Sequence, residues 1–259
     1  MNKIFYFTST GNSLYVAKEI QKRIGGEVIS IPKALKEGRL EFIGDKIGIV
    51  YPCYELRAPN IVREFIEKAN IKGRYNFSVM TYGNISLGGV EVFRKFCKKN
   101  GININYGNEL LMVDNYLPIY DIDKQMDKLD EKRIPENLNK IIDDIDREVK
   151  FIRKSRLLSQ FASSQVYKFF KESHRKMPQK FKVEESCTKC EVCIKVCPVS
   201  NIKIVEGKLE FSDRCIACFA CTHNCPTNSI RMSNEKSKTR FRNENIKLKE
   251  IIDSNNQLV

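Results

Sequence analysis

The sequence predicts an α/β fold, a doubly wound sheet of five parallel strands with helices on both faces, followed by a helical linker and a small α+β domain. In the N-terminal part, short apolar runs rich in β-branched and aromatic residues alternate with helical patterns, which is typical of a buried parallel sheet. The middle of the chain carries helical patterns only. Near the C-terminus, eight of the ten cysteines fall between Cys187 and Cys225, and this clustering needs a separate explanation.

The segments between the apolar runs read as helices. One has apolar residues at helical spacing from Leu14 to Ile24, and glycines end it. Pro59 suits the first position of a second helix, and a third carries Phe93 and Cys97 on its apolar face. The five runs predicted as strands are Ile4–Phe7, Val28–Ile31, Ile47–Tyr51, Phe77–Tyr82 and Leu110–Val113.

Four segments follow from these patterns. Residues 1–155 form the sheet domain, closed by a helix whose apolar stripe is Ile141, Ile142, Ile145, Val149 and Ile152. Residues 156–180 form a basic helical linker without a strand signal, and residues 181–235 form the cysteine-rich domain. Residues 236–259 are polar and charged, and we expect a loosely held C-terminal tail.

The N-terminus has too short an apolar region for a signal peptide, and no apolar run is long enough to span a bilayer. We therefore expect a cytoplasmic protein, in which clustered cysteines bind metal rather than form disulfides. Cys53 and Cys97 stand outside the cluster. The apolar helical face predicts that Cys97 is a core residue, and Cys53 is more typical of a loop position than of a reactive thiol.

An internal repeat organises the other eight cysteines. The pattern C-x2-C-x2-C-x3-C-P occurs twice at an offset of 28 residues, with a hairpin expected between the copies at Gly207. Four thiolates suit a [4Fe–4S] cluster, and the fourth cysteine of each motif reaches the neighbouring cluster. Structural zinc and disulfides are the alternatives. The two predicted ligand sets are Cys187, Cys190, Cys193 and Cys225, and Cys215, Cys218, Cys221 and Cys197.

This repeat resembles the bacterial two-cluster ferredoxins over residues 183–233. The resemblance implies a small α+β domain that carries two [4Fe–4S] clusters and transfers electrons. His223 lies between two of the predicted ligands. It could adjust the potential of a cluster, although an ordinary loop residue is the simpler interpretation.

A phosphate site is predicted where the first strand ends. The strand leads into Thr8, Ser9, Thr10, Gly11, Asn12 and Ser13, and a helix follows. Backbone amides, hydroxyls and a helix N-terminus can together bind an anion. The loop lacks the lysine of a nucleoside-triphosphate loop and the G-x-G-x-x-G of a dinucleotide site. An ordinary polar helix cap is the alternative.

The pattern T-x-T-G-x-S resembles the FMN phosphate loop of flavodoxins, and the resemblance covers about residues 1–118. It implies that a flavin ring lies between two further loops, with Tyr54 and Tyr82 as stacking candidates. The basic charge and the lack of tryptophan depart from typical flavodoxins. The predicted ring contacts are Pro52, Cys53, Tyr54, Thr81, Tyr82, Gly83 and Asn84.

The whole chain resembles fusions of a flavodoxin-like domain with a two-cluster ferredoxin domain. In such fusions a stretch similar to Asp114-Asn115-Tyr116 follows the fifth strand, so Asn115 and Tyr116 are expected near the flavin or the domain interface. A simple strand exit turn is the alternative.

The resemblance implies an electron-transfer protein with FMN and two [4Fe–4S] clusters as cofactors. No set of side chains suggests acid, base or nucleophilic catalysis. One alternative is an FMN-dependent reductase of a small acceptor that the clusters supply with electrons. A scaffold protein that has lost the cofactor is a further alternative, which the intact loop disfavours.

The positive charge of the chain indicates which partners it could bind. The net charge is +13, and Lys and Arg are dense over residues 150–180. This stretch favours an acidic redox partner, or peripheral contact with an anionic membrane surface. Packing of its apolar side between the domains is the simpler interpretation, and no nucleic-acid motif accompanies it.

Overall fold

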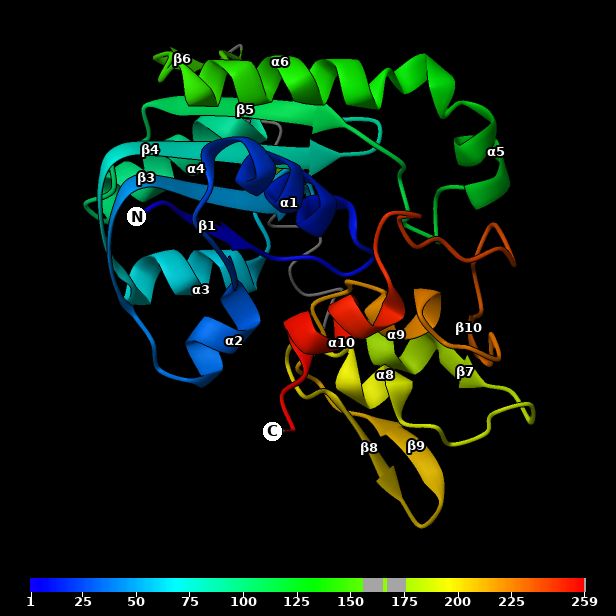
Figure 1. Cartoon of the computed structure of the whole chain (residues 1–259). Helices are drawn as coiled ribbons and strands as arrows, with labels where there is room; N and C mark the ends of the chain where they lie inside the picture. The colour runs from blue at the N-terminus through cyan, green and yellow to red at the C-terminus, as the bar shows by residue number, and fades with distance from the viewer. Residues whose placement is uncertain (156–164, 167–175, 259) are drawn as a thin grey trace.

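The computed structural model describes residues 1–155, 165–166 and 176–258. Its N-terminal domain is built on one sheet in the order β2-β1-β3-β4-β5-β6, with every neighbouring pair parallel (Figure 1). The first five strands follow the doubly wound order typical of flavodoxins. The strands are β1 Lys3–Tyr6, β2 Glu27–Ser30, β3 Glu41–Pro52, β4 Asn70–Tyr82, β5 Tyr106–Leu111 and β6 Phe151–Ile152.

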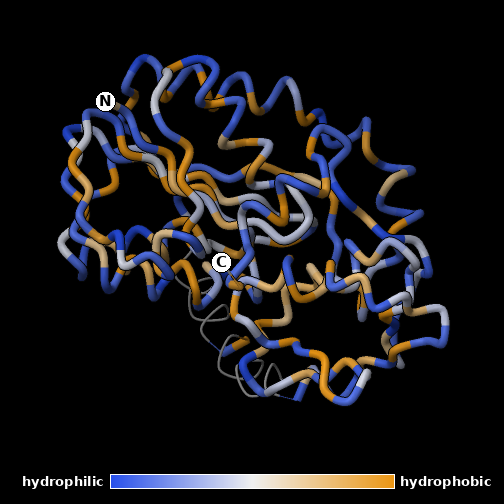
Figure 2. The backbone as a smooth tube through the Cα atoms, turned by 60° about the horizontal axis from the view of Figure 1, so that its bottom comes forward, coloured by the Kyte–Doolittle hydropathy of each residue, from blue (hydrophilic) through white to orange (hydrophobic). Residues whose placement is uncertain are grey.

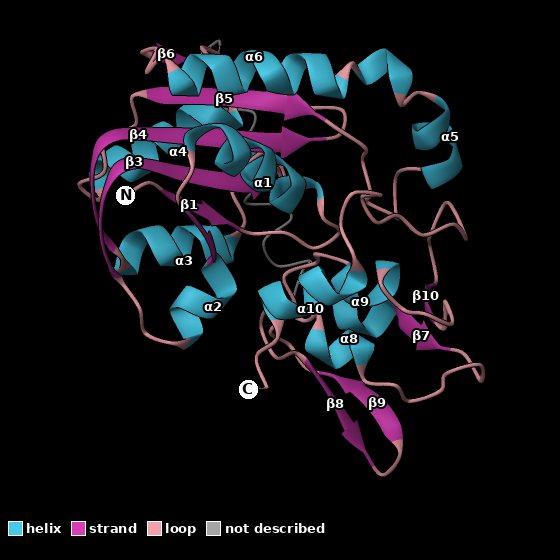
Figure 3. Ribbon diagram, in the orientation of Figure 1, coloured by secondary structure: helices cyan, strands magenta, loops and turns pink. Residues whose placement is uncertain are grey.

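Helices cover both faces of this sheet, as predicted (Figure 3). On one face α1 (Asn12–Ile24) and α6 (Ile134–Asp146) pack against Ile4, Val50 and Val79. On the other face α2 (Ile31–Lys36), α3 (Asn60–Lys68) and α4 (Gly89–Lys99) enclose a second core. Each core is made by alternate residues of the strands, because successive side chains of a strand point to opposite faces. Figure 2 shows these apolar strands in the interior, with hydrophilic stretches on the outer turns.

Two expectations about the edge of this domain are wrong. The sheet has a sixth strand, β6, which pairs with Tyr106 and Gly107 of β5. The helix α6 ends at Asp146, so Val149 and Ile152 do not continue its stripe. Glu148 has a left-handed φ of 57°, which breaks the helix and lets the chain turn back to the sheet edge. A two-residue strand is too short to show an alternating pattern in the sequence.

The short helix α5 (Ile122–Asp127) and a 3-10 turn, η1 (Asp130–Lys132), connect β5 to α6. The predicted linker of residues 156–180 lies mostly outside the described residues. Of its described part, residues 165–166 are helical and Met177–Lys180 form a second 3-10 turn, η2.

The C-terminal domain is built from two similar halves around short antiparallel strands. Its elements are β7 (Phe181–Val183), α8 (Val192–Lys195), β8 (Ile202–Val205), β9 (Lys208–Phe211), α9 (Ala220–His223) and β10 (Ile230–Met232). β7 pairs with β10, and β8 with β9 in the predicted hairpin at Gly207. The internal repeat is visible in the backbone, because left-handed residues recur at the same offset of 28: Lys189 and Ala217, Glu191 and Phe219, Ser200 and Asn228.

The end of the chain is not a loosely held tail, and that expectation is wrong. After β10 the chain returns to the N-terminal domain and ends in α10 (Leu248–Asn255) (Figure 1). Ile246 and Ile251 are buried in the core beside α1. The overall polarity of this stretch conceals a few well-spaced apolar residues and buried asparagines, which is why composition alone was misleading.

Candidate functional site

The loop at residues 8–13 joins β1 to the N-terminus of α1. Gly11 precedes the helix with a φ of 102°, a left-handed conformation that disfavours a side chain. The amide of Gly11 donates to Thr8 Oγ1 at 3.0 Å, which closes the turn. Among the described residues no side chain caps this helix. Its first amides therefore remain available to an anion, as a phosphate site requires.

The hydroxyls of the loop are held by neighbouring segments. Ser9 Oγ lies 3.0 Å from the hydroxyl of Tyr54, and Ser13 Oγ lies 2.9 Å from Thr81 Oγ1. Asn115 Nδ2 donates to Thr10 Oγ1 at 2.5 Å. These contacts join the loop to the end of β4 and to the segments that follow β3 and β5. In parallel strands these segments meet at the carboxyl edge of the sheet, where such folds bind ligands.

A pocket of about 410 Å³ opens between these segments. Of the predicted cofactor contacts, all but Gly11 and Asn84 line it. Gly11 faces the C-terminal segment instead, and the exposed Asn84 donates to Asp114 Oδ2 at 3.1 Å. The lining residues are Thr8, Ser9, Thr10, Asn12, Ser13, Pro52, Cys53, Tyr54, Thr81, Tyr82, Gly83, Val113, Asp114 and Asn115.

A larger cleft of about 1130 Å³, partly open to solvent, continues from this pocket. Cys53, Tyr54, Asp114 and Asn115 line both spaces. The far wall of the cleft comes from the C-terminal domain and includes Cys218. Tyr54 thus stands where the two spaces meet, whereas Tyr82 lines only the smaller one. Of the two stacking candidates, Tyr54 is the better placed for a ring that lies in the cleft.

Burial governs the ionisable groups around this cleft. It raises the pKa of the Cys53 thiol to about 12 and holds it neutral, which agrees with a structural loop position. Burial likewise raises the pKa of Glu55 to about 7 and that of Asp114 above its usual value. The pKa of Tyr54 is raised well above its usual value by burial, and a charge on Cys218 would raise it further. Tyr54 is therefore a neutral aromatic residue beside a predicted cluster ligand.

One of the two predicted cysteine sets, Cys197, Cys215, Cys218 and Cys221, lines a single small cavity, and the electrostatic contributions to the pKa values link thiols within the same two sets. Burial raises the pKa of Cys193 to about 12, and the thiols that add to this rise belong to Cys225, Cys187 and Cys190. Burial also raises the pKa of Cys221 well above its usual value, and there the contributing thiols belong to Cys218, Cys215 and Cys197. In both sets the fourth cysteine of one motif interacts with the three cysteines of the other, and ligation of a cluster by each set stays a prediction.

The donor set of each group fits a cluster. Thiols are the donors that ligate iron, the four thiols of the set that contains Cys218 line one small cavity, and binding of iron would release their protons. Within the described residues, no three His, Cys, Asp or Glu side chains gather as closely as a single metal ion requires. All eight cysteines are free of disulfides.

The two sets differ in their surroundings. In the set that contains Cys218, this cysteine alone lines the large cleft beside Tyr54, and Cys221 is buried. In the other set Cys190 is exposed to solvent. One predicted cluster therefore faces the candidate flavin site, and the other has a ligand at the molecular surface.

His223 is a buried bridge between the domains and is not an ordinary loop residue. Its Nδ1 accepts from the amide of Phe241 at 3.1 Å, so Nε2 carries the proton and donates to the carbonyl of Asn115 at 2.8 Å. Burial lowers its pKa to about 4, and the ring is neutral near pH 7. Asn115 therefore lies both in the pocket wall and at the domain interface, where it was expected.

Sequence reasoning missed several residues that build the site. Lys132 is buried, and its Nζ donates to the carbonyl of Gly83 at 3.2 Å, under the loop that follows β4. Asn224, Asn243 and Asn255 contact the phosphate loop from the C-terminal half. Isolated lysines and asparagines carry no periodic pattern, so no signal in the sequence distinguished them.

The cysteine-rich part of the chain matches a known family. Residues 152–244 match the family model described as the 4Fe-4S dicluster domain, and the sheet before it has the doubly wound order given above. The chain therefore joins a sheet domain with the strand order of flavodoxins to a segment that matches the 4Fe-4S dicluster domain. No curated protein matches the chain. Among the described residues, no helix has the length and apolar character needed to cross a membrane.

Several solved structures are similar to part of the chain. An NADH:FMN oxidoreductase in its apo form is 14% identical, with a TM-score of 0.43, over 61% of this chain and 92% of its own. A flavoprotein from Lactobacillus acidophilus NCFM, solved with FMN, is 15% identical, with a TM-score of 0.31, over 50% and 97%. An azoreductase from Bacillus anthracis str. Sterne is 11% identical, with a TM-score of 0.36, over 57% and 100%.

Proposed function

We propose that this fusion protein is an electron carrier that exchanges electrons between FMN and two [4Fe–4S] clusters and passes them to a redox partner. One observation carries the proposal: Tyr54, beside the phosphate loop, and Cys218, a predicted cluster ligand, line the same cleft. When bound, the flavin would supply one- or two-electron chemistry and each cluster single electrons. The protein holds these groups close together and tunes them.

Different residues would hold the different cofactors. The loop at residues 8–13 would hold the phosphate, and Tyr54 would pack against the ring. The two cysteine sets would hold two clusters, one at the cleft and one near the surface at Cys190. His223 and Tyr54 are both neutral and add no charge of their own to this region.

A second function, reduction of a small acceptor, is favoured by the size and lining of the cleft. Leu56, Tyr116 and Phe219 line it, and the exposed apolar side chains of Ile85 and Ile119 stand at its rim. Such a wall suits a planar, mostly apolar molecule. Turnover of small quinones or nitroaromatic compounds by the purified protein, at rates above those of free FMN, would favour this function over that of a carrier.

The partner and the compartment are also proposals. The exposed ligand Cys190 marks the surface where a redox protein would dock, and the net charge of +13 favours an acidic one. Clustered thiols without disulfides suit the reducing cytoplasm. The basic stretch that suggested a membrane surface lies mostly outside the described residues.

Cofactor content tests the proposed function. The protein is purified without oxygen, and iron, acid-labile sulfide and flavin are assayed per chain. We expect about eight irons and eight sulfides, as two cubane clusters require, with one FMN. Iron and sulfide without flavin, even after FMN is added, would refute the flavin half of the proposal. About four irons would refute the second cluster.

A further inference from the structure

Three consecutive carbonyls of the phosphate loop accept hydrogen bonds from asparagines of the C-terminal half. Asn255 Nδ2 donates to the carbonyl of residue 8 at 2.9 Å, and Asn224 Nδ2 to that of residue 9 at 3.0 Å. The backbone amide of Asn243 donates to the carbonyl of residue 10 at 2.8 Å. Both side-chain donors are buried, Asn255 fully so. Donors more than two hundred residues away thus fix the back of the loop.

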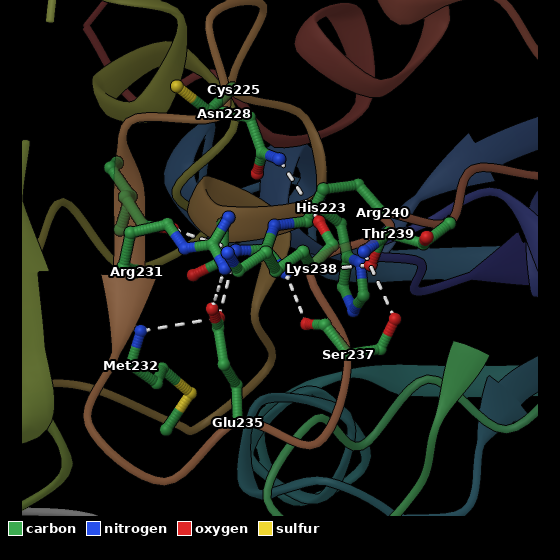
Figure 4. Close-up of polar contacts among 12 residues, drawn as sticks. His223, Cys225, Asn228, Arg231, Met232, Glu235, Ser237, Lys238, Thr239 and Arg240 are labelled. Atoms are coloured by element: carbon green, nitrogen blue, oxygen red, sulfur yellow. Dashed lines mark hydrogen bonds and ion pairs between the residues drawn. The ribbon is translucent and has the colours of Figure 1, made fainter. Parts of the chain in front are cut away.

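Two of these asparagines lie on the return segment, which we define as residues 236–255. A compact turn directs this segment back to the N-terminal domain (Figure 4). The buried carboxylate of Glu235 pairs with Arg231 and Arg240 and accepts from the amide of Met232. Since these partners are themselves largely buried, the turn has a fixed direction.

The return segment packs directly behind the loop. A Cβ atom built on Gly11 would lie 3.0 Å from the Cβ atoms of both Asn243 and Ile246. Farther along, Ser254 Oγ lies 2.7 Å from the hydroxyl of Tyr6, and the carbonyl of Ser254 accepts from Ser30 Oγ. The segment therefore follows the ends of β1 and β2 as well as the loop between β1 and α1.

These contacts have a direct effect on anion binding. A carbonyl that rotates into the pocket would place its negative end against a phosphate, and three carbonyls bonded to the rear cannot do so without losing a buried hydrogen bond. The loop amides are then free to face the pocket. Because the loop is already ordered before the phosphate binds, binding costs less conformational entropy.

We propose that Asn224, Asn243 and Asn255 are positioning residues for the phosphate of FMN, an inference that rests on the proposed function. Asn224 lies between the predicted ligands Cys221 and Cys225, and its segment is shaped by the cleft-side cysteine set. The phosphate site is thus completed by the cluster-bearing half of the chain, and phosphate binding is coupled to the folding of that half.

The test compares FMN with riboflavin, which has the same ring but no phosphate. Asn255→Ala and Asn224→Ala are prepared with clusters loaded and flavin removed, and both dissociation constants are measured by quenching of flavin fluorescence. We expect about tenfold weaker binding of FMN, as loss of a buried hydrogen bond that orders the phosphate loop implies. Riboflavin affinity should stay within about twofold because the ring contacts are retained.

Asn76→Ala is the matched control. Asn76 is also buried, its Nδ2 also donates to a carbonyl, that of Asn103 at 3.0 Å, and its side-chain oxygen also lacks a partner among the described residues. It lies on β4, away from the loop, and its substitution should leave the ratio of the two affinities unchanged. Iron content and the midpoint of thermal unfolding are recorded for every variant.

The outcomes separate the inference from the proposed function. Unchanged FMN binding, or equal weakening of FMN and riboflavin, in Asn255→Ala would overturn the positioning role. If Asn224→Ala loses its clusters, Asn255→Ala decides, because Asn255 is not next to a cysteine in the sequence. A wild-type protein that binds neither flavin would refute the proposed function itself.

Discussion

Cys197 and Cys225 each interact with the three cysteines of the other motif, and not with those of the motif that contains them in the sequence. The backbone makes this exchange possible. The left-handed residues of each motif, such as Glu191 and Phe219, wrap three cysteines tightly, and the short helix that follows carries the fourth away. The exchange ties the two halves of the repeat together through their metal ligands.

Pairs of cysteine substitutions test this exchange. We expect Cys197→Ser with Cys190→Ser to abolish both clusters, because the two residues belong to different sets, and to leave almost no iron. Cys197→Ser with Cys218→Ser should remove one cluster only and leave about four irons per chain. Iron and sulfide assays on protein purified without oxygen measure the difference. The reverse pattern would show that each motif binds its own cluster.

At the scale of elements, β3 and β4 extend well before the runs that predicted them, and their extensions mix polar with apolar residues. Arg74 on β4 joins Asp45 on β3 to Glu148, which follows α6. Hydrogen bonds from Arg74 lower the pKa of Glu148 to about 2 and also lower that of Asp45. Three elements therefore meet at this exposed network at the amino edge of the sheet.

Arg74→Gln should lower the unfolding midpoint only slightly, since the network is exposed to solvent. A carboxylate whose pKa is lower in the folded than in the unfolded protein stabilises the fold. Its contribution is complete above the pKa of the unfolded state and is lost as the pH falls toward the pKa of the folded state. The difference in unfolding midpoint between Arg74→Gln and the wild type, called the deficit below, should therefore be constant between about pH 6 and pH 8. About 0.5 M salt should reduce this deficit.

Thermal unfolding followed by circular dichroism measures the deficit. Lys68→Gln, which breaks an ion pair within α3 alone, controls for the loss of one positive charge. A deficit that is large, insensitive to salt, or equal in both variants would contradict the role assigned to this network.

At the scale of the whole molecule, the cores of the two domains are not independent. Ile251 is fully buried in the core beside α1, which also contains Val196 and Ala220 of the C-terminal domain. Together with His223 and the three asparagines, this shared core joins the sheet domain to the cysteine-rich domain. Distances between the cofactor sites should accordingly be set by folding, without a separate docking step.

Ile251→Ala should destabilise both halves at once, by about 2–5 kcal/mol, as is usual when a buried isoleucine is truncated. Loss of ellipticity and bleaching of the iron–sulfur absorbance should shift together to lower temperature. Ile43→Ala is the control, because Ile43 is 76% exposed. Bleaching that keeps its wild-type midpoint while the ellipticity shifts would show that the domains unfold separately.

Much of the fold was predictable because its signals are local. The apolar runs gave the five longer strands, and the loop chemistry of Thr8 and Gly11 marked the edge where the pocket forms. The two-residue β6 and the return segment were missed. Their stability comes from contacts with distant residues, as in the pairing of Phe151 with Tyr106, which leave no period in the sequence.

The sequence alone predicted the ligand chemistry: which cysteines group together, and which loop would present amides to an anion. Ligand spacing and strand–loop–helix order are properties of adjacent residues, so they can be read along the chain. Only the tertiary structure decided which cysteine set faces the cleft, that His223 bridges the domains, and that Asn224 and Asn255 hold the loop. Those roles depend on the packing of segments up to 247 residues apart, where a single asparagine looks like any other.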